Sequence, residues 1–521
     1  MHPPAQIVVL GAGFAGLAAV KALRKARNVR VTLVDRTNHH LFQPLLYQVA
    51  SAALNPSEIA AATRAVLRGQ KNARVLMGEV THVDYKQRTV DLDGGQTRLF
   101  YDYLILAMGG RTSYFGQDQW QQHAPGLKSL DDAIEIRTRL LAAFERAEKV
   151  QDPEDRQRLM TFVVVGGGPT GVELAGAFAE LRRHVLRWDF RDIDPASARI
   201  VLIEAADSLL GPFPERLRQD AAQRLQELGV EVRLKEKVLS IRPGVVETST
   251  GPIPTETCIW AAGVGGHELA ADLGPNRDRA GRLLVEEDLR LPGQDRVWCL
   301  GDMAHYEHPH TLGGRTLPGV APVALQQGRH AARDILRLLK GESTRPFYYQ
   351  DKGSMATIGR SAAVAFVGPV QMTGPLAWLA WLFVHLMYLV DFQLRVLVLI
   401  RWTWAYFTWK WGVRLITRPL QERHCPLPGL LDPTEGMGTS GPGLSAGRRP
   451  TAFGGGRGGN ARSEAGGDTG PGTPPSRVPG REVCAPAPCA RSHRRQQSDR
   501  PDATRSDPPS LQADSGTIVP V

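Results

Sequence analysis

The sequence has little cysteine for its length. Its 521 residues include only five, at Cys258, Cys299, Cys425, Cys484 and Cys489. They form no C-x-x-C pair and show no zinc spacing, which argues against a structural zinc site and a dithiol redox centre. We therefore expect structural thiols, no bound metal and a reducing, cytosolic compartment.

Long apolar runs and a secretion signal are also missing. Residues 376–390 form an apolar stretch broken only by His385. As a helix this stretch spans about 22 Å, short of the roughly 30 Å of a bilayer core. The first apolar run, residues 7–10, has no basic segment ahead of it, so we expect no signal peptide. A single transmembrane helix near residues 376–400 is only our second choice.

Charge and aromatic residues are unevenly spread. The net charge of +10 suits nucleic acid or an anionic membrane, and six of the ten tryptophans fall between residues 375 and 418. Lys410, Arg414 and Arg418 follow at helical spacing and are expected on one helical face. This predicts an amphipathic helix at a membrane interface, with a buried hairpin or dimer contact as the alternative and no nucleic-acid partner.

A glycine motif near the start predicts the first nucleotide site. Residues 7–10 read as a strand, Gly11, Gly13 and Gly16 form G-x-G-x-x-G before a helix, and a second strand ends at Asp35. The glycines permit a tight turn, close approach to a pyrophosphate and helix packing, while the acid can bind a ribose. We assign Gly11, Gly13, Gly16 and Asp35 to FAD.

The same arrangement recurs from residue 161 to residue 204. Gly166, Gly168 and Gly171 repeat the motif, and the next strand ends at Glu204. The charged extension at residues 182–198 lengthens the spacing and is expected to loop out. Residues 205–208 contain no arginine for a 2′-phosphate, which favours NADH over NADPH. Residues 230–239 and 245–250 are expected to form a hairpin.

Other segments are expected to complete the two sites. Residues 74–99 alternate as an antiparallel crossover with Gly94-Gly95 as its hairpin turn, and strands end at Gly109, Gly263 and the pair Gly301-Asp302. The helix expected over residues 321–339 begins with Ala324, Gln326 and Gln327, where its positive end would face a reduced flavin. We assign to the FAD site Val80, Gly109, Gly301, Asp302, Ala324 and Gln327, and to the NADH site Gly263.

Several longer stretches are similar to type II, single-subunit NADH:quinone oxidoreductases, which do not pump protons. They lie between about residue 5 and residue 420. Besides the two glycine motifs, they are HLFQPLLYQVA at residues 40–50, residues 300–302, APVALQQG at residues 321–328, DKGSMATIGR at residues 351–360, and residues 381–386 with their aromatic tail.

The resemblance implies non-covalent FAD, NADH as donor, and a membrane quinone such as ubiquinone or menaquinone as acceptor in a respiratory chain. It also implies peripheral attachment to the cytoplasmic face of the inner membrane, with a homodimer left open. Glu173 would lie near the nicotinamide, Lys352 near the flavin ring and Gln326 at the quinone pocket. Whether Glu173 relays a proton or ties down its helix stays open.

The predicted fold is α/β, with two Rossmann-like domains, the second inserted in the first. Residues 1–112 and 264–345 form the FAD domain, residues 113–263 the NADH domain and residues 346–424 a membrane-attachment region. Residues 425–521, rich in Gly, Pro, Ser and Arg, are expected to be disordered.

Other functions were weighed against this one. Disulfide reductases need a cysteine pair in residues 37–60, where none occurs, and sulfide:quinone oxidoreduction is disfavoured because Cys258 and Cys299 fall in or beside expected strands. A soluble NADH:acceptor reductase and an NADH-sensing membrane flavoprotein remain as alternatives.

Overall fold

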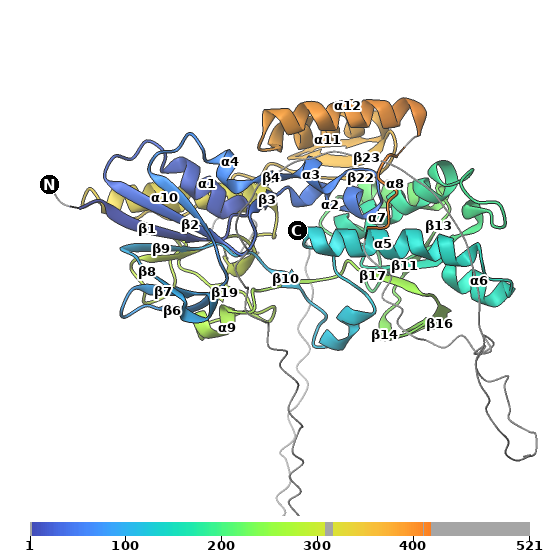
Figure 1. Cartoon of the computed structure of the whole chain (residues 1–521), viewed down its shortest axis with the longest axis horizontal. Helices are drawn as coiled ribbons and strands as arrows, with labels where there is room; N and C mark the ends of the chain where they lie inside the picture. The colour runs from blue at the N-terminus through green and yellow to red at the C-terminus, as the bar shows by residue number, and fades with distance from the viewer. Residues whose placement is uncertain (1–2, 308–315, 410, 418–521) are drawn as a thin grey trace, which may run out of the picture. The chain divides into compact units, whose positions relative to one another are not determined.

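The computed structural model of the chain describes residues 3–307, 316–409 and 411–417 (Figure 1). The segment predicted to be disordered, residues 425–521, lies outside these residues.

The first parallel sheet is built from chain segments that come both before and after the second parallel sheet in the sequence. Its order is β20-β9-β1-β2-β5, so the strand that begins at residue 297 pairs with the one that begins at residue 103. Its strands are β1 (Ala5–Leu10), β2 (Val29–Asp35), β5 (Ala73–Met77), β9 (Tyr103–Leu106) and β20 (Val297–Cys299). The second unit is therefore inserted in the first, as predicted.

Alternate residues of β1 pack on opposite faces of this sheet. Ile7 and Val9 join the core beneath two helices, whereas Val8 and Leu10 join the core with a small antiparallel sheet. The helices are α1 (Phe14–Ala22) and α10 (Ala321–Leu338), and the sheet comprises β6 (Val80–Asp84), β7 (Thr89–Leu92) and β8 (Thr97–Phe100).

Short elements complete the first unit. They are β3 (His39–Leu41), β4 (Ala60–Ala62), α2 (Leu46–Ala50), α3 (Pro56–Ile59), α4 (Thr63–Val66), α9 (Ala270–Leu273), β19 (Leu283–Leu284) and β21 (Ala304–His305). The two chain segments that connect the units pair with each other as β10 (Arg111–Thr112) and β18 (Val264–Gly265).

The second unit repeats the parallel architecture with the order β13-β12-β11-β17. Its strands are β11 (Thr161–Val165), β12 (Arg199–Glu204), β13 (Val230–Leu234) and β17 (Thr257–Trp260). Its helices are α5 (Leu130–Ala147), α6 (Pro153–Leu159), α7 (Pro169–Glu180) and α8 (Glu215–Glu227). A small sheet follows, made of β14 (Val238–Arg242), β15 (Val245–Thr248) and β16 (Gly251–Pro254).

Two expectations for this unit are settled by the pairing of its strands. The extension at residues 182–198 holds a π-helical turn (Leu181–Val185) and a 3-10 turn (Pro195–Ser197), and β12 still pairs with β11 along its length. The extension is thus looped out, as predicted. The hairpin expected between residues 230–239 and 245–250 is wrong in its first strand, because β13 joins the parallel sheet and the strand that pairs with β15 is β14.

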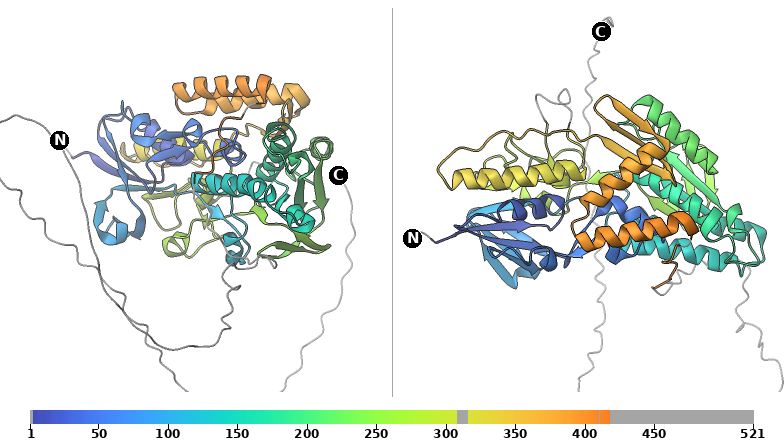
Figure 2. Two further views of the ribbon diagram at one scale, coloured as in Figure 1. Left: turned by 45° about the vertical axis from the view of Figure 1, so that its right-hand side comes forward. Right: turned by 90° about the horizontal axis from the view of Figure 1, so that it is seen from above.

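The C-terminal region is a three-stranded antiparallel sheet that carries two helices. The sheet holds β22 (Ser354–Gly359), β23 (Ala362–Val367) and β24 (Val370–Thr373), and the helices are α11 (Gly374–Tyr388) and α12 (Phe392–Thr408). Figure 2, right, looks onto α11 and α12, which lie on the side of the unit away from β14 and β16 in Figure 1.

Two predictions for this region need correction. The helix ends at Thr408, Trp409 has φ of 56°, and Arg414 lies beyond the helix, so the helical face expected for Lys410, Arg414 and Arg418 is wrong. Lys410 and Arg418 themselves lie outside the described residues. Within the described ranges no helix is both long and apolar enough to cross a membrane, which overturns the second choice of a helix spanning residues 376–400.

Candidate functional site

The first glycine turn lies between β1 and α1 and leaves no room for side chains at two positions. Gly11 has φ of +100°, and a Cβ there would lie 2.2 Å from the Ala107 carbonyl oxygen. A Cβ on Gly16 would lie 1.9 Å from the oxygen of Gly11, whereas one on Gly13 would meet no atom within 4 Å. Gly13 thus leaves open space at the start of α1, where a phosphate would be held.

The second glycine turn reproduces this geometry. Gly166 has φ of +113°, and a Cβ on Gly171 would lie 1.8 Å from its oxygen, while Gly168 again has open space. The backbone match extends to hydrogen bonds, since Gly11 N donates to Val34 O at 2.7 Å and Gly166 N donates to Ile203 O at 2.8 Å. The predicted duplication is confirmed at the level of single backbone atoms.

An acid stands beside each turn in the same way. Asp35 accepts from Ala12 N at 2.6 Å and from Thr37 N at 2.7 Å. Glu204 accepts from Gly167 N at 2.6 Å and from Ala206 N at 2.7 Å. Each carboxylate is therefore held against its turn at the carboxyl end of a parallel strand, where nucleotides bind in such folds.

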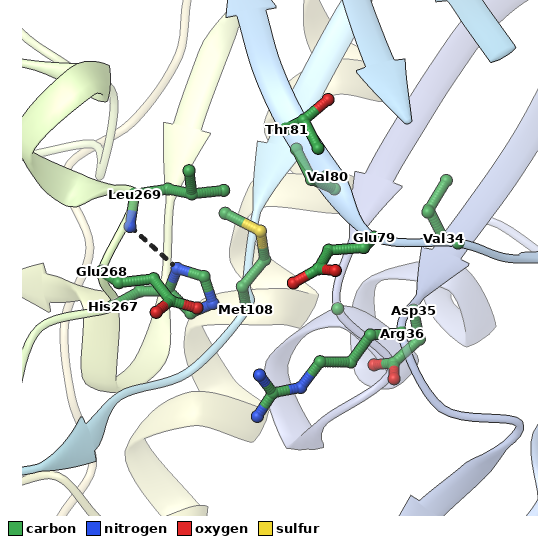
Figure 3. Close-up of a pocket in the computed structure, with 12 residues that line it drawn as sticks. Val34, Asp35, Arg36, Glu79, Val80, Thr81, Met108, His267, Glu268 and Leu269 are labelled. Carbon is green, nitrogen blue, oxygen red and sulfur yellow. Dashed lines mark hydrogen bonds between the residues drawn. The ribbon is translucent and has the colours of Figure 1, made fainter. Parts of the chain in front are cut away.

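A cavity of about 320 Å³ opens at the carboxyl end of β2. Gly11, Asp35 and the buried Val80 line it, as their assignment to one site requires. Figure 3 shows Arg36, which follows β2, and Glu79, which precedes β6, on this cavity. Sequence reasoning missed a second group of lining residues because they are distant along the chain, namely Met108, His267, Glu268 and Leu269.

Two other expected FAD residues already have partners within the protein. Asp302 Oδ2 lies 3.1 Å from Lys128 Nζ, and both side chains are mostly buried. Gln327 is 1% exposed, and its Oε1 accepts from Gly301 N at 2.7 Å. Gln327 therefore fixes the strand end that carries Asp302, and Lys128, which no sequence motif marked, belongs to the same cluster.

Three further assigned glycines and Ala324 lie at turns and helix starts. Gly109, Gly263 and Gly301 all have positive φ, and a Cβ on Gly301 would lie 3.7 Å from Ala324 Cβ. A Cβ on Gly263 would lie 2.7 Å from the Phe115 ring, so this turn has no space for a side chain.

Glu173 lies on α7, just after its first turn and two residues after the second glycine motif. Thr357 N on β22 donates to its Oε1 at 3.4 Å, and burial of the carboxyl raises the pKa of Glu173 to about 8. Burial and then the charge of Glu173 also raise the pKa of Tyr47. The Tyr47 hydroxyl accepts from Gln48 Nε2 at 2.8 Å, and Gln48 Oε1 accepts from Trp402 Nε1 at 2.8 Å, so this polar chain reaches α12.

Gln326 binds the backbone of the segment that links α10 to β22, two residues before Lys352. Gln326 Nε2 donates to Gln350 O at 2.9 Å, and its Oε1 accepts from Gln350 N at 3.0 Å. Both ends of the amide are thus engaged by backbone. The exposed Lys352 follows two residues later.

An arginine approaches the loop after Glu204, although none occurs in residues 205–208. Arg218 of α8 donates from its NH1 group to Ser208 Oγ at 2.8 Å. No motif in the sequence indicates this contact.

The outer faces of α11 and α12 are apolar and exposed. Residues of α11 spaced three or four apart, Leu376, Leu379, Phe383 and Met387, are 48–72% exposed, while Ala377 and Trp381 are buried. On α12 the outward residues are 40–76% exposed and comprise Phe392, Val396, Ile400, Trp404 and Phe407. We call these two faces the apolar surface. Patches of this kind mark contact with a membrane or a protein.

The two described cysteines and His40 occupy structural positions. Cys258 and Cys299 are buried in β17 and β20, and burial raises the pKa of the Cys258 thiol to about 12. His40 Nδ1 lies within hydrogen-bonding distance of Ala12 O, at 2.7 Å. Over the ranges described, no group of three or more His, Cys, Asp and Glu side chains is placed to hold a metal ion.

The chain holds two glycine turns of one design, and the unit with the second turn is inserted in the unit with the first. This arrangement defines a class of oxidoreductases that bind two dinucleotides. The sequence profile of the pyridine nucleotide-disulphide oxidoreductase family matches residues 5–328. The protein is 46% identical to the type II NADH:quinone oxidoreductase Ndh of Mycobacterium tuberculosis, over 80% of this chain and 91% of that protein. The chain belongs to the type II NADH:quinone oxidoreductase family.

More distant relatives agree with this placement. The type II NADH:quinone oxidoreductase of Staphylococcus aureus (strain MSSA476) is 28% identical, over 71% of this chain and 91% of that protein. The solved structure of NDH2 from Plasmodium falciparum in complex with NADH superposes with a TM-score of 0.71 at 21% identity, covering 80% of this chain and all of that one. This likeness shows a shared fold.

Proposed function

We propose that the protein oxidises NADH and reduces a membrane quinone by way of non-covalently bound FAD. The observation that carries this proposal is the pair of matching glycine turns, each with its own carboxylate, in a chain 46% identical to a type II NADH:quinone oxidoreductase. Two turns provide for two nucleotides. Of these two nucleotides, only the oxidised donor needs to dissociate during turnover.

The first turn suits FAD. Gly13 leaves backbone space at the start of α1, Asp35 is positioned for a ribose, and the cavity bounded by Val80 is of a size for one end of a dinucleotide. Bound FAD supplies a two-electron carrier that takes hydride from NADH and passes two electrons to quinone. In our assignment Gly109, Gly301, Asp302 and Ala324 border the rest of the cofactor, and Gln327 holds Gly301 in place.

The second turn suits NADH. Gly168 provides the phosphate space, and Gly166, Gly171 and Gly263 shape the loops around it. A carboxylate at Glu204 favours a ribose with free hydroxyls and repels a 2′-phosphate, which supports NADH over NADPH. One Arg218 donor is already engaged by Ser208 Oγ.

Three residues are assigned to the reacting region. Glu173, with its raised pKa, can hold a proton near the nicotinamide at neutral pH. Gln326 binds the backbone that leads to Lys352, so in this proposal it positions that lysine beside the flavin ring and borders the quinone pocket. Pro322 stands in the first turn of the same helix, where it offers the quinone no side-chain donor.

The apolar surface supports peripheral attachment to a bilayer, with quinone entering from the lipid. In this proposal the domain limits given above hold, and attachment is to the cytoplasmic face of the inner membrane. Replacing Phe383 by Glu should shift the full-length protein, in a flotation gradient, from the floating membrane fraction to the bottom fraction. Phe100→Glu is the matched control, because Phe100 is 69% exposed against 62% for Phe383 and lies on β8. Equal behaviour of both variants would argue against this surface.

The central test is spectroscopic. The purified full-length protein should be yellow, NADH should bleach the flavin within the mixing time of a stopped-flow instrument, and a quinone in detergent should restore the colour quickly. Rapid reoxidation by oxygen or a protein carrier, with none by ubiquinone or menaquinone, would favour the soluble reductase. Slow reoxidation by every acceptor would favour an NADH sensor.

A further inference from the structure

A second cavity, of about 770 Å³, opens between α1, α10 and the bend that joins α11 to α12. Its apolar lining comes from all three places and includes Leu17, Leu325 and Met387. Four basic side chains also line it, namely Lys21, Arg329, Arg333 and Arg395. No acidic residue is among the residues that line this cavity.

The four cations lack counter-charges in the part of the chain that the structure describes. None of them takes part in an ion pair there, whereas Arg337 on the same helix α10 pairs with Asp334. Arg329 and Arg333 stand four residues apart on one helix, an arrangement of like charges that disfavours the helix. Desolvation, and next the charge of Arg395, lower the pKa of Lys21.

The backbone fixes these cations at the cavity. A Cβ on Gly328 would lie 2.1 Å from the Ala15 oxygen, so α1 and α10 are in close contact and hold Lys21 and Arg329 on neighbouring helices. Arg395 Nε donates to Leu389 O at 2.9 Å, which anchors its side chain at the α11–α12 bend. The cluster therefore lies on three regular helices, α1, α10 and α12.

The cavity opens beside the apolar surface. Met387 and Tyr388, both exposed, line the cavity, and Met387 is also a member of that surface. Phe392, 76% exposed, begins α12 three residues before Arg395. A ligand here meets uncompensated positive charge on one side and exposed hydrocarbon on the other.

We propose that this cavity binds the headgroup of an anionic phospholipid, with its phosphate among the four cations and its acyl chains along the apolar surface. The inference rests on the proposed membrane attachment and adds lipid selectivity to it. A neutral quinone headgroup gives no reason for four unpaired cations, and a free phosphate gives none for the apolar rim. Arginine forks are well suited to phosphate oxygens.

The test compares vesicles of phosphatidylcholine with and without phosphatidylglycerol, using the full-length FAD-loaded protein. The double variant Arg329→Gln/Arg333→Gln should lose about 30-fold in affinity for the anionic vesicles, since each of the two basic residues contributes on the order of 1 kcal/mol near such a surface. Its binding to phosphatidylcholine vesicles should not change. The control Lys86→Gln/Arg279→Gln removes the same charge from exposed positions in the β6–β7 turn and after α9.

Equal loss in both double variants would overturn the proposal in favour of diffuse attraction, and no loss in either would overturn it outright. Should the first variant lose its flavin, Lys21→Gln/Arg395→Gln takes its place. In detergent, short-chain phosphatidylglycerol should bind at least tenfold more tightly than glycerol phosphate or inorganic phosphate, and equal binding would mean a free-anion site. If wild type binds no vesicles, membrane attachment itself fails; if it binds both kinds alike, only the headgroup site fails.

Discussion

The two glycine turns are built alike but are covered by different parts of the chain. Helix α1 packs against α10, where a Cβ on Gly328 would collide with the Ala15 oxygen at 2.1 Å. Helix α7 packs against β22 of the C-terminal sheet, where a Cβ on Gly176 would lie 1.9 Å from the Ile358 oxygen. In both places a glycine allows two backbones to touch.

The difference arises because the C-terminal sheet, which is not part of the duplication, covers the second turn. The C-terminal sheet and the second nucleotide unit share one hydrophobic core, which includes Val172 of α7, Trp381 of α11 and Val398 of α12. The helices that carry the apolar surface therefore pack on the unit that we assign to NADH. Trp402 extends the contact to the first unit through Gln48.

Replacing the last glycine of each motif by alanine should have the largest effect on nucleotide binding at the two turns. Gly16→Ala should place a Cβ on the Gly11 oxygen, cost at least about 2 kcal/mol of stability and give protein without flavin. Gly171→Ala should keep the flavin but abolish its bleaching by NADH. Absorbance spectra before and after NADH report both outcomes.

Gly211→Ala serves as the control, because a Cβ there would meet nothing within 4 Å. Loss of flavin in Gly171→Ala with retention in Gly16→Ala would mean that the two units carry the opposite nucleotides.

Removing the acids should have a smaller effect that sharpens the same assignment. Glu204→Ala should raise the KM for NADH by about 10- to 100-fold and leave the flavin content intact, because a charge-assisted hydrogen bond contributes about 1.5–3 kcal/mol. Asp35→Ala should weaken FAD retention by a similar factor, measured by flavin release on dilution. Glu204→Gln keeps the hydrogen-bonding shape and should fall between wild type and Glu204→Ala.

The sequence was sufficient to predict both turns and the inserted order of the units. Strand, glycine motif and terminal acid are local signals, and the chain at 182–198 could be recognised as an insertion because the strand after it was intact. The first strand of the hairpin predicted between residues 230–239 and 245–250 was wrong. Lys235, with φ of 56°, ends β13, and the chain passes there from one sheet to another. Alternation alone does not tell which partner a strand will take.

Contacts between distant residues were beyond the sequence. Lys128 reaches Asp302 across 174 residues, and the four cations of the second cavity come from three separate helices. The end of α12 was misplaced because Trp409 leaves the helix to stack on His184, with ring centroids 4.2 Å apart, while Arg360 lies over the same ring. Helical spacing in residues 410–418 carried no trace of these tertiary contacts.

The smallest expected effect concerns Glu173, which has no acidic counterpart after the first glycine motif, where the equivalent position is Ala18. With a folded pKa of about 8 against an ordinary value of 4.5, the folded protein keeps a proton that the unfolded chain releases between these pH values. Stability from this group should therefore fall as pH rises from about 5 to 8. Glu173→Gln, which cannot ionise, should remove that slope and raise the melting temperature at pH 8 by about 2–4 °C relative to wild type, with little difference at pH 5.

Thermal unfolding of the FAD-loaded protein at both pH values measures this difference. Glu180→Gln is a useful companion, because burial raises the pKa of Glu180 to about 7 and its carboxylate accepts from Arg360 N away from the glycine turn. Both variants should flatten the pH dependence, but only Glu173→Gln should also alter the pH profile of NADH oxidation. That separation distinguishes a proton held near the nicotinamide from one that merely joins α7 to the C-terminal sheet, and an unchanged profile in Glu173→Gln would leave Glu173 with the structural role alone.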